Sequence, residues 1–250
     1  MKNVLLFVWC CFAIPFSWAQ ETDPTPKTEK KEKPPIALYK IISHQRDTTH
    51  VDTTLSIQKE YKFNYLRKDN FELQPFANVG QTYNTLAYDF SRKNFKPLFV
   101  AQSHHFNFQQ IEDISYYNVP TPLTELYFKT AFEQGQQLDA FFTVNTSEQF
   151  NFSIAYKGVR SLGQYQQALT STGNFRFTTN YHTKNNRYKI RAHVVAQDIL
   201  NEENGGLRPT SIPLFVNDEG NFDDRARIDV NFENASNKLE GLHLLASGIV

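Results

Sequence analysis

The stretch TELYFKTAFEQGQQLDAFFTVNTSEQFNFSIAYKG, residues 124–158, decides the fold class of this chain. Phenylalanine and tyrosine are abundant in it, but polar residues interrupt every apolar run. Apolar side chains occupy every second position of residues 138–144 and of residues 150–156, and mostly polar side chains stand between them. Because successive side chains of a β-strand point to opposite faces, this two-residue period predicts strands with one apolar and one polar face.

The same alternation continues on both sides of this stretch. The segments that keep one apolar and one polar face are residues 125–132, 138–144, 150–156, 175–181, 188–196 and 226–232. Tight turns are expected at residues 133–137, 145–149 and 183–187. Longer polar loops are expected at residues 160–172 and 198–224. Further upstream, we expect short strands within residues 36–42 and 51–66.

Two architectures use sheets with one aromatic-rich face. A β-sandwich packs its apolar faces against each other, whereas a transmembrane β-barrel turns its apolar face to lipid. Tight turns that alternate with long loops favour the barrel, as do segments that approach the roughly nine to eleven residues of a membrane strand. We therefore predict an all-β, antiparallel transmembrane β-barrel of meandering hairpins. The alternative is a secreted or surface-associated β-sandwich that binds a partner through its loops.

The composition argues against several other functions. Of the 250 residues, 26 are Lys or Arg and 26 are Asp or Glu, so the formal net charge of zero does not favour nucleic-acid binding. The mean hydropathy is negative, which disfavours a bundle of membrane helices. The sequence has no nucleophile elbow, phosphate loop or HExxH zinc motif. We expect neither an enzyme nor a cofactor.

The N-terminus has the pattern of an export signal. In MKNVLLFVWCCFAIPFSWAQ, Lys2 precedes an apolar run that is followed by a small-x-small cleavage site at residues 17–19. Residues 1–19 are therefore expected to be a signal peptide, with a short anchor helix as the alternative. Cys10 and Cys11 would leave with it, so the exported protein would carry no disulfide. Residues 20–35 mix Pro, Lys, Glu and Thr and are expected to form a disordered linker.

The polar faces of the expected strands would line the wet interior of a barrel. The candidate lumen-facing residues are Lys129, Asn151, Lys157, Asn174, Arg176, Lys189, Arg191, His193, Arg227 and Asp229. Rings of charge in such a lumen influence which solutes enter. Because this set is mostly cationic, we expect passive diffusion of small solutes with a mild preference for anions.

Two clusters contain metal-ligand residue types without the arrangement that a metal site needs. His104 and His105 are adjacent, so on a strand they would point to opposite faces. Residues 218–224 offer carboxylates, but they lack the spacing of a calcium loop and are expected to form a polar external loop. No metal site is predicted.

Several long stretches carry a family resemblance. They are PPIALYKIISHQRDTTHVDTTLSIQKEYKFNYLRKDNFELQPFANVGQTYN (residues 34–84), NVPTPLTELYFKTAFEQGQ (118–136), FNFSIAYKGVRSLGQY (150–165), STGNFRFTTNY (171–181) and AQDILNEENGG (196–206). These stretches resemble the putative porins of the Bacteroidetes outer membrane. The resemblance implies an outer-membrane β-barrel that passes small solutes, contacts lipid and the barrel assembly machinery, and has no catalytic residues.

The resemblance extends from about residue 34 to residue 237. The following stretch LEGLHLLASGIV, residues 239–250, has no clear alternation, and the expected strands barely reach the roughly eight of the smallest closed barrels. We therefore expect an incomplete N-terminal part of a longer barrel. The expected division is a signal peptide (1–19), a linker (20–35), a strand-rich N-terminal region (36–122), barrel hairpins (123–240) and a divergent, truncated end (241–250).

Overall fold

The computed structural model describes residues 33–52, 66, 72–81, 83–87, 106–131, 135–217 and 224–249. The chain divides into two units, Met1–Lys33 and Pro34–Val250, and every described helix and strand belongs to the second. Several sequence predictions lie outside the described residues. They are the signal peptide, the linker up to residue 32, most of the strand expected within residues 51–66, the pair His104 and His105, and residues 218–223 of the expected external loop.

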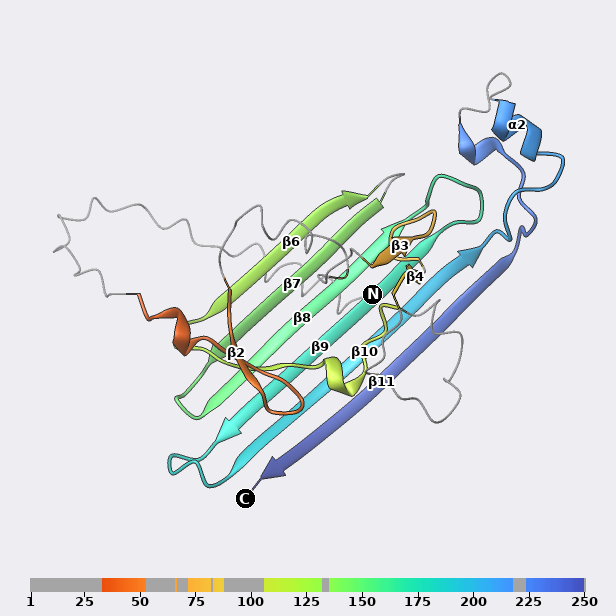
Figure 1. The fold of residues 1–250 in the computed structure, drawn as a ribbon. Helices are drawn as coiled ribbons and strands as arrows, with labels where there is room; N and C mark the ends of the chain where they lie inside the picture. The colour runs from red at the N-terminus through yellow and green to blue at the C-terminus, as the bar shows by residue number, and fades with distance from the viewer. Residues whose placement is uncertain are drawn as a thin grey trace, which may run out of the picture. The chain divides into compact units, whose positions relative to one another are not determined.

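A six-stranded antiparallel sheet forms the larger part of the described structure (Figure 1). Each strand pairs with the next in the sequence, so the sheet is an uninterrupted meander. Its strands are β6 (Leu123–Ala131), β7 (Gly135–Asn145), β8 (Phe150–Ser161), β9 (Thr170–His182), β10 (Lys189–Glu203) and β11 (Ala235–Ile249). The predicted all-β, antiparallel fold is confirmed. Among the described strands, β6 and β11 are the two edges, so the sheet is open.

The strand register places the alternating side chains in continuous rows. One row of cross-strand partners contains Phe142, Ile154, Phe177, Val194 and Leu244. The neighbouring row, on the other face, contains Thr143, Ser153, Thr178, His193 and Leu245. The aromatic and aliphatic residues that are dispersed in the sequence therefore form one apolar surface, because a one-residue step changes the face of the sheet.

The sheet buries its polar face and exposes its apolar face. On the polar face, Thr143 is 0% and His193 is 1% exposed, although both side chains are polar. On the apolar face, Leu126 and Leu244 are each 69% exposed. This polarity is the reverse of that in a water-soluble sheet, where the apolar face packs on the core.

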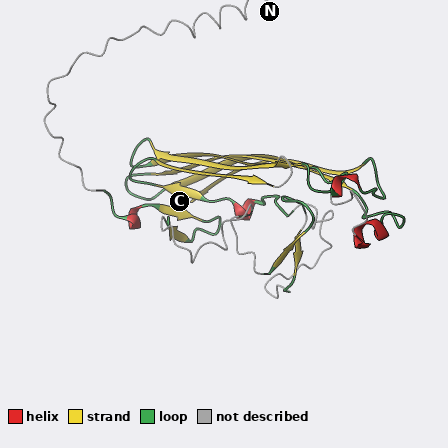
Figure 2. Cartoon of the chain, turned by 90° about the horizontal axis from the view of Figure 1, so that it is seen from above, coloured by secondary structure: helices red, strands yellow, loops and turns green. Residues whose placement is uncertain are grey.

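Small elements from the N-terminal part of unit Pro34–Val250 cover the polar face. Figure 2 shows them on one side of the large sheet. They comprise two small antiparallel sheets, one with the strand order β2-β1-β5 and one formed by β3 and β4, together with 3-10 helices. Their bounds are η1 (Ile36–Leu38), β1 (Lys40–Ile42), β2 (Thr48–His50), β3 (Leu73–Pro75), β4 (Tyr83–Thr85), η4 (Ile111–Asp113) and β5 (Tyr116–Asn118).

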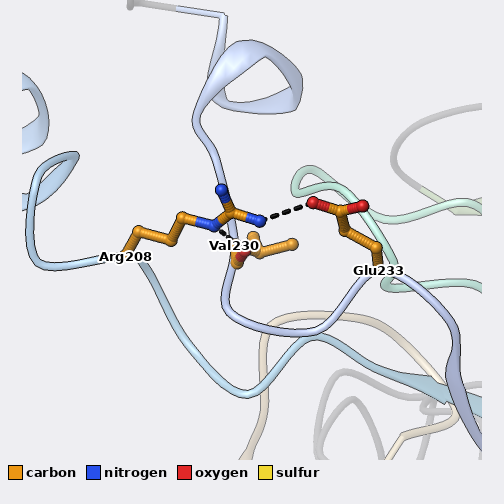
Figure 3. A network of polar contacts seen from close by, with 3 residues as sticks. All are labelled: Arg208, Val230 and Glu233. Carbon is orange, nitrogen blue, oxygen red and sulfur yellow. Dashed lines mark hydrogen bonds and ion pairs between the residues drawn. The ribbon is translucent and has the colours of Figure 1, made fainter.

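The connections differ between the two ends of the large sheet. Residues 146–149 and 183–188 make short turns at one end, whereas residues 162–169 and 204–234 make longer connections at the other. β6 also ends and β7 begins at this second end, at Ala131 and Gly135. The longest connection contains α2 (Ile212–Asn217) and η5 (Arg225–Arg227). Arg208 closes its base, because the guanidinium donates to the Val230 carbonyl at 2.8 Å and pairs with Glu233 (Figure 3).

Residues 226–232 do not form the strand that their alternation predicted. They contain η5 and only one isolated β-bridge, between Leu207 and Val230. Ile228 and Val230 are buried, but within the long connection instead of on a sheet face. The sixth strand is β11, which includes most of residues 239–250, the stretch in which no clear alternation was found.

The alternation also underestimated the length of several strands. β9 begins at Thr170 and β10 continues to Glu203, within stretches that were expected to be loops. At the end of the sheet with the longer connections, the otherwise apolar face carries polar residues such as Asp198 and Glu202, so hydropathy no longer distinguishes the two faces. The backbone hydrogen bonds of the ladder continue nevertheless, because they do not depend on side-chain polarity.

None of the helices in the described residues has both the length and the apolar character needed to cross a membrane.

Candidate functional site

The polar face of β6 to β11 is the candidate functional surface. Eight of the ten residues predicted to face a lumen lie on it by register: Lys129, Asn151, Lys157, Asn174, Arg176, Lys189, Arg191 and His193. The other two, Arg227 and Asp229, do not lie on the sheet, because their segment is η5 and the loop that follows it. Whether the eight residues line a lumen stays a prediction.

At the short-turn end, side chains of β7 and β8 form a buried hydrogen-bond network. Asn151 donates through Nδ2 to Thr143 Oγ1 at 3.0 Å and to Asn145 Oδ1 at 2.7 Å. Ser153 Oγ also donates to Thr143 Oγ1, at 3.0 Å. Asn145 in turn accepts a hydrogen bond from the backbone N–H of Val119, in the segment between β5 and β6, at 3.0 Å. The amide and hydroxyl groups therefore satisfy one another in the absence of charge.

A second network centres on Gln197 in the middle of β10. Its Oε1 accepts hydrogen bonds from Asn174 Nδ2 at 2.8 Å and from the backbone N–H of Gln109 at 3.0 Å. Its Nε2 donates to the Gln109 carbonyl at 2.9 Å. Arg176 reaches the side-chain oxygen of Gln109 at 3.3 Å. The primary amide of Gln197 thus binds the backbone of residue 109 as an adjacent β-strand would.

A third network connects two histidines with a tyrosine. His193 Nδ1 lies 2.8 Å from the Tyr116 hydroxyl, and His193 Nε2 lies 3.2 Å from His243 Nδ1. Burial raises the pKa of Tyr116, while the charge of Arg191 acts in the opposite direction. The phenol is therefore protonated at neutral pH and can donate to His193 Nδ1. His193 can then donate from Nε2 to His243, so both neutral rings fit one consistent set of tautomers.

The cations of the polar face are partly balanced by acids on the same face. By register, Lys157 lies opposite Asp139, and Glu125 and Glu203 also belong to this face. Lys129 and Lys189 are exposed, whereas Arg176 and Arg191 are half-buried. Arg191 donates to the Ser43 carbonyl at 3.2 Å and its guanidinium carbon lies 5.5 Å from the centre of the Tyr116 ring.

Several polar residues of this surface were not among the candidates. Four of them are buried on the polar face: Thr143, Thr178, Asn180 and Gln197. Gln109 belongs to the N-terminal part of the chain and contacts this face through its hydrogen bonds with Gln197. Gln197 continues the alternation of Arg191 and His193, so a longer strand prediction would have included it. The contribution of Gln109 has no comparable signal, because its segment is far away in the sequence.

No cluster of three or more residues of metal-binding type occurs in the part of the chain that the structure describes. The chemistry of the surface is that of amides, hydroxyls, imidazoles and a few charges. Such groups can hydrogen-bond water and polar solutes.

An antiparallel meander with an outward apolar face and an inward polar face has the strand arrangement of transmembrane β-barrel proteins. The family model described as "Putative porin" matches residues 35–246 of the chain. The chain therefore belongs to this porin family, and the family resemblance noted in the sequence is confirmed. No curated protein and no solved structure matches the chain.

Proposed function

We propose that the chain forms part of an outer-membrane β-barrel through which small solutes diffuse passively. The observation that carries this proposal is the polarity of the large sheet, whose exposed face is apolar and whose covered face is polar. Membership of the porin family supports the same function. In this proposal residues 1–19 direct export, and the barrel assembly machinery inserts the chain into the outer membrane.

The exposed apolar face fits a lipid environment. One register row across all six strands consists of Leu126, Ala140, Tyr156, Phe175, Ala196 and Leu242. Apolar surface in water costs about 25 cal/mol per Å², so lipid is the favoured neighbour of such a row. Toward the long connections the same face becomes polar, with Arg160, Asp198 and Glu240. This change fits a strand end that leaves the hydrocarbon layer.

The same polarity disfavours the β-sandwich alternative. A sandwich would bury Leu126, Phe175 and Leu242 between two sheets and leave Asn174 and His193 in water. The described sheet has the reverse arrangement. A barrel in lipid requires that the edges of β6 and β11 pair with further strands, because unpaired backbone groups are costly in hydrocarbon.

Solutes would pass along the polar side of the sheet. Its cations are Lys129, Lys157, Arg176, Lys189 and Arg191, and its acids are Glu125, Asp139 and Glu203. The excess of cations favours a mild preference for anions. We expect no catalytic step, since the side chains of this surface need only exchange hydrogen bonds with a passing solute.

Fractionation and gel mobility test the proposal. We expect the exported chain in the outer-membrane fraction, extractable with detergent and not with alkaline carbonate, with a mobility in unheated gels that differs from that of the boiled sample. Reconstituted vesicles should then admit small sugars and anions faster than protein-free vesicles. A protein that is soluble in buffer without detergent and has no heat-dependent mobility would contradict the barrel and support the sandwich.

A further inference from the structure

The N-terminal segment, defined as the described residues between 33 and 119, binds the polar face of the large sheet through specific contacts. It contacts β7, β8, β9, β10 and β11. This is the face that points toward the interior when such a sheet closes into a barrel with its apolar face in lipid. The N-terminal segment would therefore lie inside the barrel, on the side along which solutes pass.

The middle of the N-terminal segment is held by paired amides. Gln109 exchanges two hydrogen bonds of 3.0 and 2.9 Å with the side chain of Gln197, which is 6% exposed. The side chain of Gln197 is removed from bulk water, so separating it from Gln109 leaves a buried amide whose donor needs a new partner. Arg176 adds a charged donor to the same residue of the segment.

A second group of contacts lies around β5. Tyr116 meets His193 as described above, and the Tyr117 carbonyl accepts a hydrogen bond from Asn180 at 3.3 Å. The Tyr117 ring lies 4.5 Å from the ring of Phe141 between centroids. Both polar and aromatic contacts thus hold β5 against the centre of the sheet.

The third group of contacts requires that the backbone of the N-terminal segment and the large sheet approach each other closely. Asn78 donates through Nδ2 to the carbonyls of Ser161 and Ala168, at 3.0 and 2.7 Å. A methyl group on Gly80 would lie 2.7 Å from Val159 Cγ1, and one on Gly241 would lie 2.7 Å from the Phe108 ring. The ring of Phe108 thus occupies the space that a side chain at position 241 would fill.

From these contacts we infer that the N-terminal segment is an internal plug, which occupies the lumen of the assembled barrel and narrows the path for solutes. The inference rests on the proposed barrel. β5 leads directly into β6 at the end of the sheet that carries the short turns. These turns face the periplasm in bacterial barrels, so the plug enters from the periplasmic side. Solutes that follow the polar face must then pass beside the plug or displace it.

Cross-linking tests the location of the plug. Phe108→Cys with Gly241→Cys places two thiols across the contact, in a background in which Cys10 and Cys11 are replaced by serine. The matched control is Phe108→Cys with Leu242→Cys, because Leu242 is adjacent but lies on the exposed apolar face. With a short bifunctional maleimide, we expect a mobility shift of the first pair in outer membranes and none of the control. Absence of the shift in protein that retains heat-dependent mobility would overturn the plug while leaving the barrel intact.

Thiol labelling provides an independent measurement that requires no contact pair. Thr178 is 1% exposed beneath the N-terminal segment, whereas Lys129 lies on the same face of the sheet and is exposed. A water-soluble maleimide should label Lys129→Cys readily and Thr178→Cys much more slowly. Gln197→Ala, which removes both hydrogen bonds to Gln109, should increase the labelling of Thr178→Cys. Equal labelling of both thiols in the parent would contradict a plug. Loss of heat-dependent mobility in the parent would instead contradict the proposed function.

Discussion

At the scale of single residues, amides, hydroxyls and rings carry most of the specific contacts between the two layers. Tyr116 and Tyr117 illustrate why these contacts between the N-terminal segment and the sheet do not require charged groups. Burial is the main cause that raises the pKa of both phenols, with smaller opposing contributions from Arg191 and Arg176 respectively. At neutral pH each is an uncharged group whose ring packs and whose backbone or hydroxyl group hydrogen-bonds to the sheet.

These raised pKa values predict an alkaline transition of the plug. The folded pKa lies above that of the unfolded chain, so the contribution to stability is constant below about pH 10 and is lost as the pH rises through the folded pKa. We expect the contacts of Tyr116 and Tyr117 with the sheet to weaken as the pH rises above about 10, which the labelling of Thr178→Cys relative to that of the exposed Lys129→Cys at each pH would report. The double variant Tyr116→Phe and Tyr117→Phe should be less sensitive to this rise. An identical pH dependence of parent and double variant would exclude the two phenols as the cause.

At the scale of elements, each strand is a two-sided object whose outward face changes character along its length. On β11, Leu242 and Leu244 are exposed and apolar, while Lys238 and Glu240 on the same face form an ion pair. Residues two apart on one face are separated by about 7 Å along the strand, so lipid and water can contact one strand at different heights. In the proposed barrel, this change along β11 would mark the membrane boundary.

Cysteine labelling on β11 tests this boundary. Lys238→Cys should react with a membrane-impermeant maleimide on intact cells, because the long connections face outward in bacterial barrels. Leu244→Cys lies about 20 Å away on the same face and should be protected by lipid until detergent is added. Equal reactivity of the two thiols on intact cells would mean that the apolar part of this face is not in the hydrocarbon layer.

Charge substitution on β8 tests the face itself. Ile154→Arg places a charge on the apolar face and should reduce folding into lipid vesicles by about 2–4 kcal/mol if the residue is near the bilayer midplane. Lys157→Arg introduces the same side chain on the polar face of the same strand and should fold as the parent does. The fraction with native mobility in unheated gels measures the difference. Equal yields of the two variants would remove the main support for the lipid-facing assignment.

At the scale of the whole molecule, unit Pro34–Val250 combines an open sheet, whose apolar face is exposed, with an N-terminal segment that covers the polar face. The two ends of the sheet differ, since both longer connections, residues 162–169 and 204–234, lie at the same end. The long connections also contact each other, because Arg225 donates to the Tyr165 hydroxyl at 2.6 Å and its guanidinium carbon lies 5.7 Å from the centre of the Tyr165 ring. The two long connections therefore form one contiguous surface at this end of the sheet.

Protease cleavage tests the orientation of the molecule. Arg225 and Arg227 in the long connection are exposed, and so are Lys184 and Arg187 in a short turn. Trypsin added to intact cells should cleave the long connection and leave the short turn uncut until the outer membrane is disrupted. Cleavage at Arg187 in intact cells, without cleavage of the long connection, would require the opposite orientation.

Local patterns in the sequence predicted much of the large sheet. The alternation in residues 138–144, 150–156, 175–181 and 188–196 identified both the strands and their faces, and eight of the ten candidate residues lie on the polar face. The reason is that a strand faces two environments, so its side chains record the two-residue period directly. β11 was missed because both of its faces mix polar and apolar residues, with Leu239 and Leu245 on the polar side.

The sequence by itself thus determined the fold class and the two faces of the central strands, because these depend on neighbours two residues apart. It also determined the family, because the long stretches that carry the resemblance are present in the chain itself. Only the tertiary structure decided what covers the polar face. The contacts of Gln109 with Gln197, of Tyr116 with His193 and of Phe108 with Gly241 join segments that are far apart in the chain. No local period encodes such contacts, since their residues become neighbours only when the N-terminal segment folds back onto the sheet.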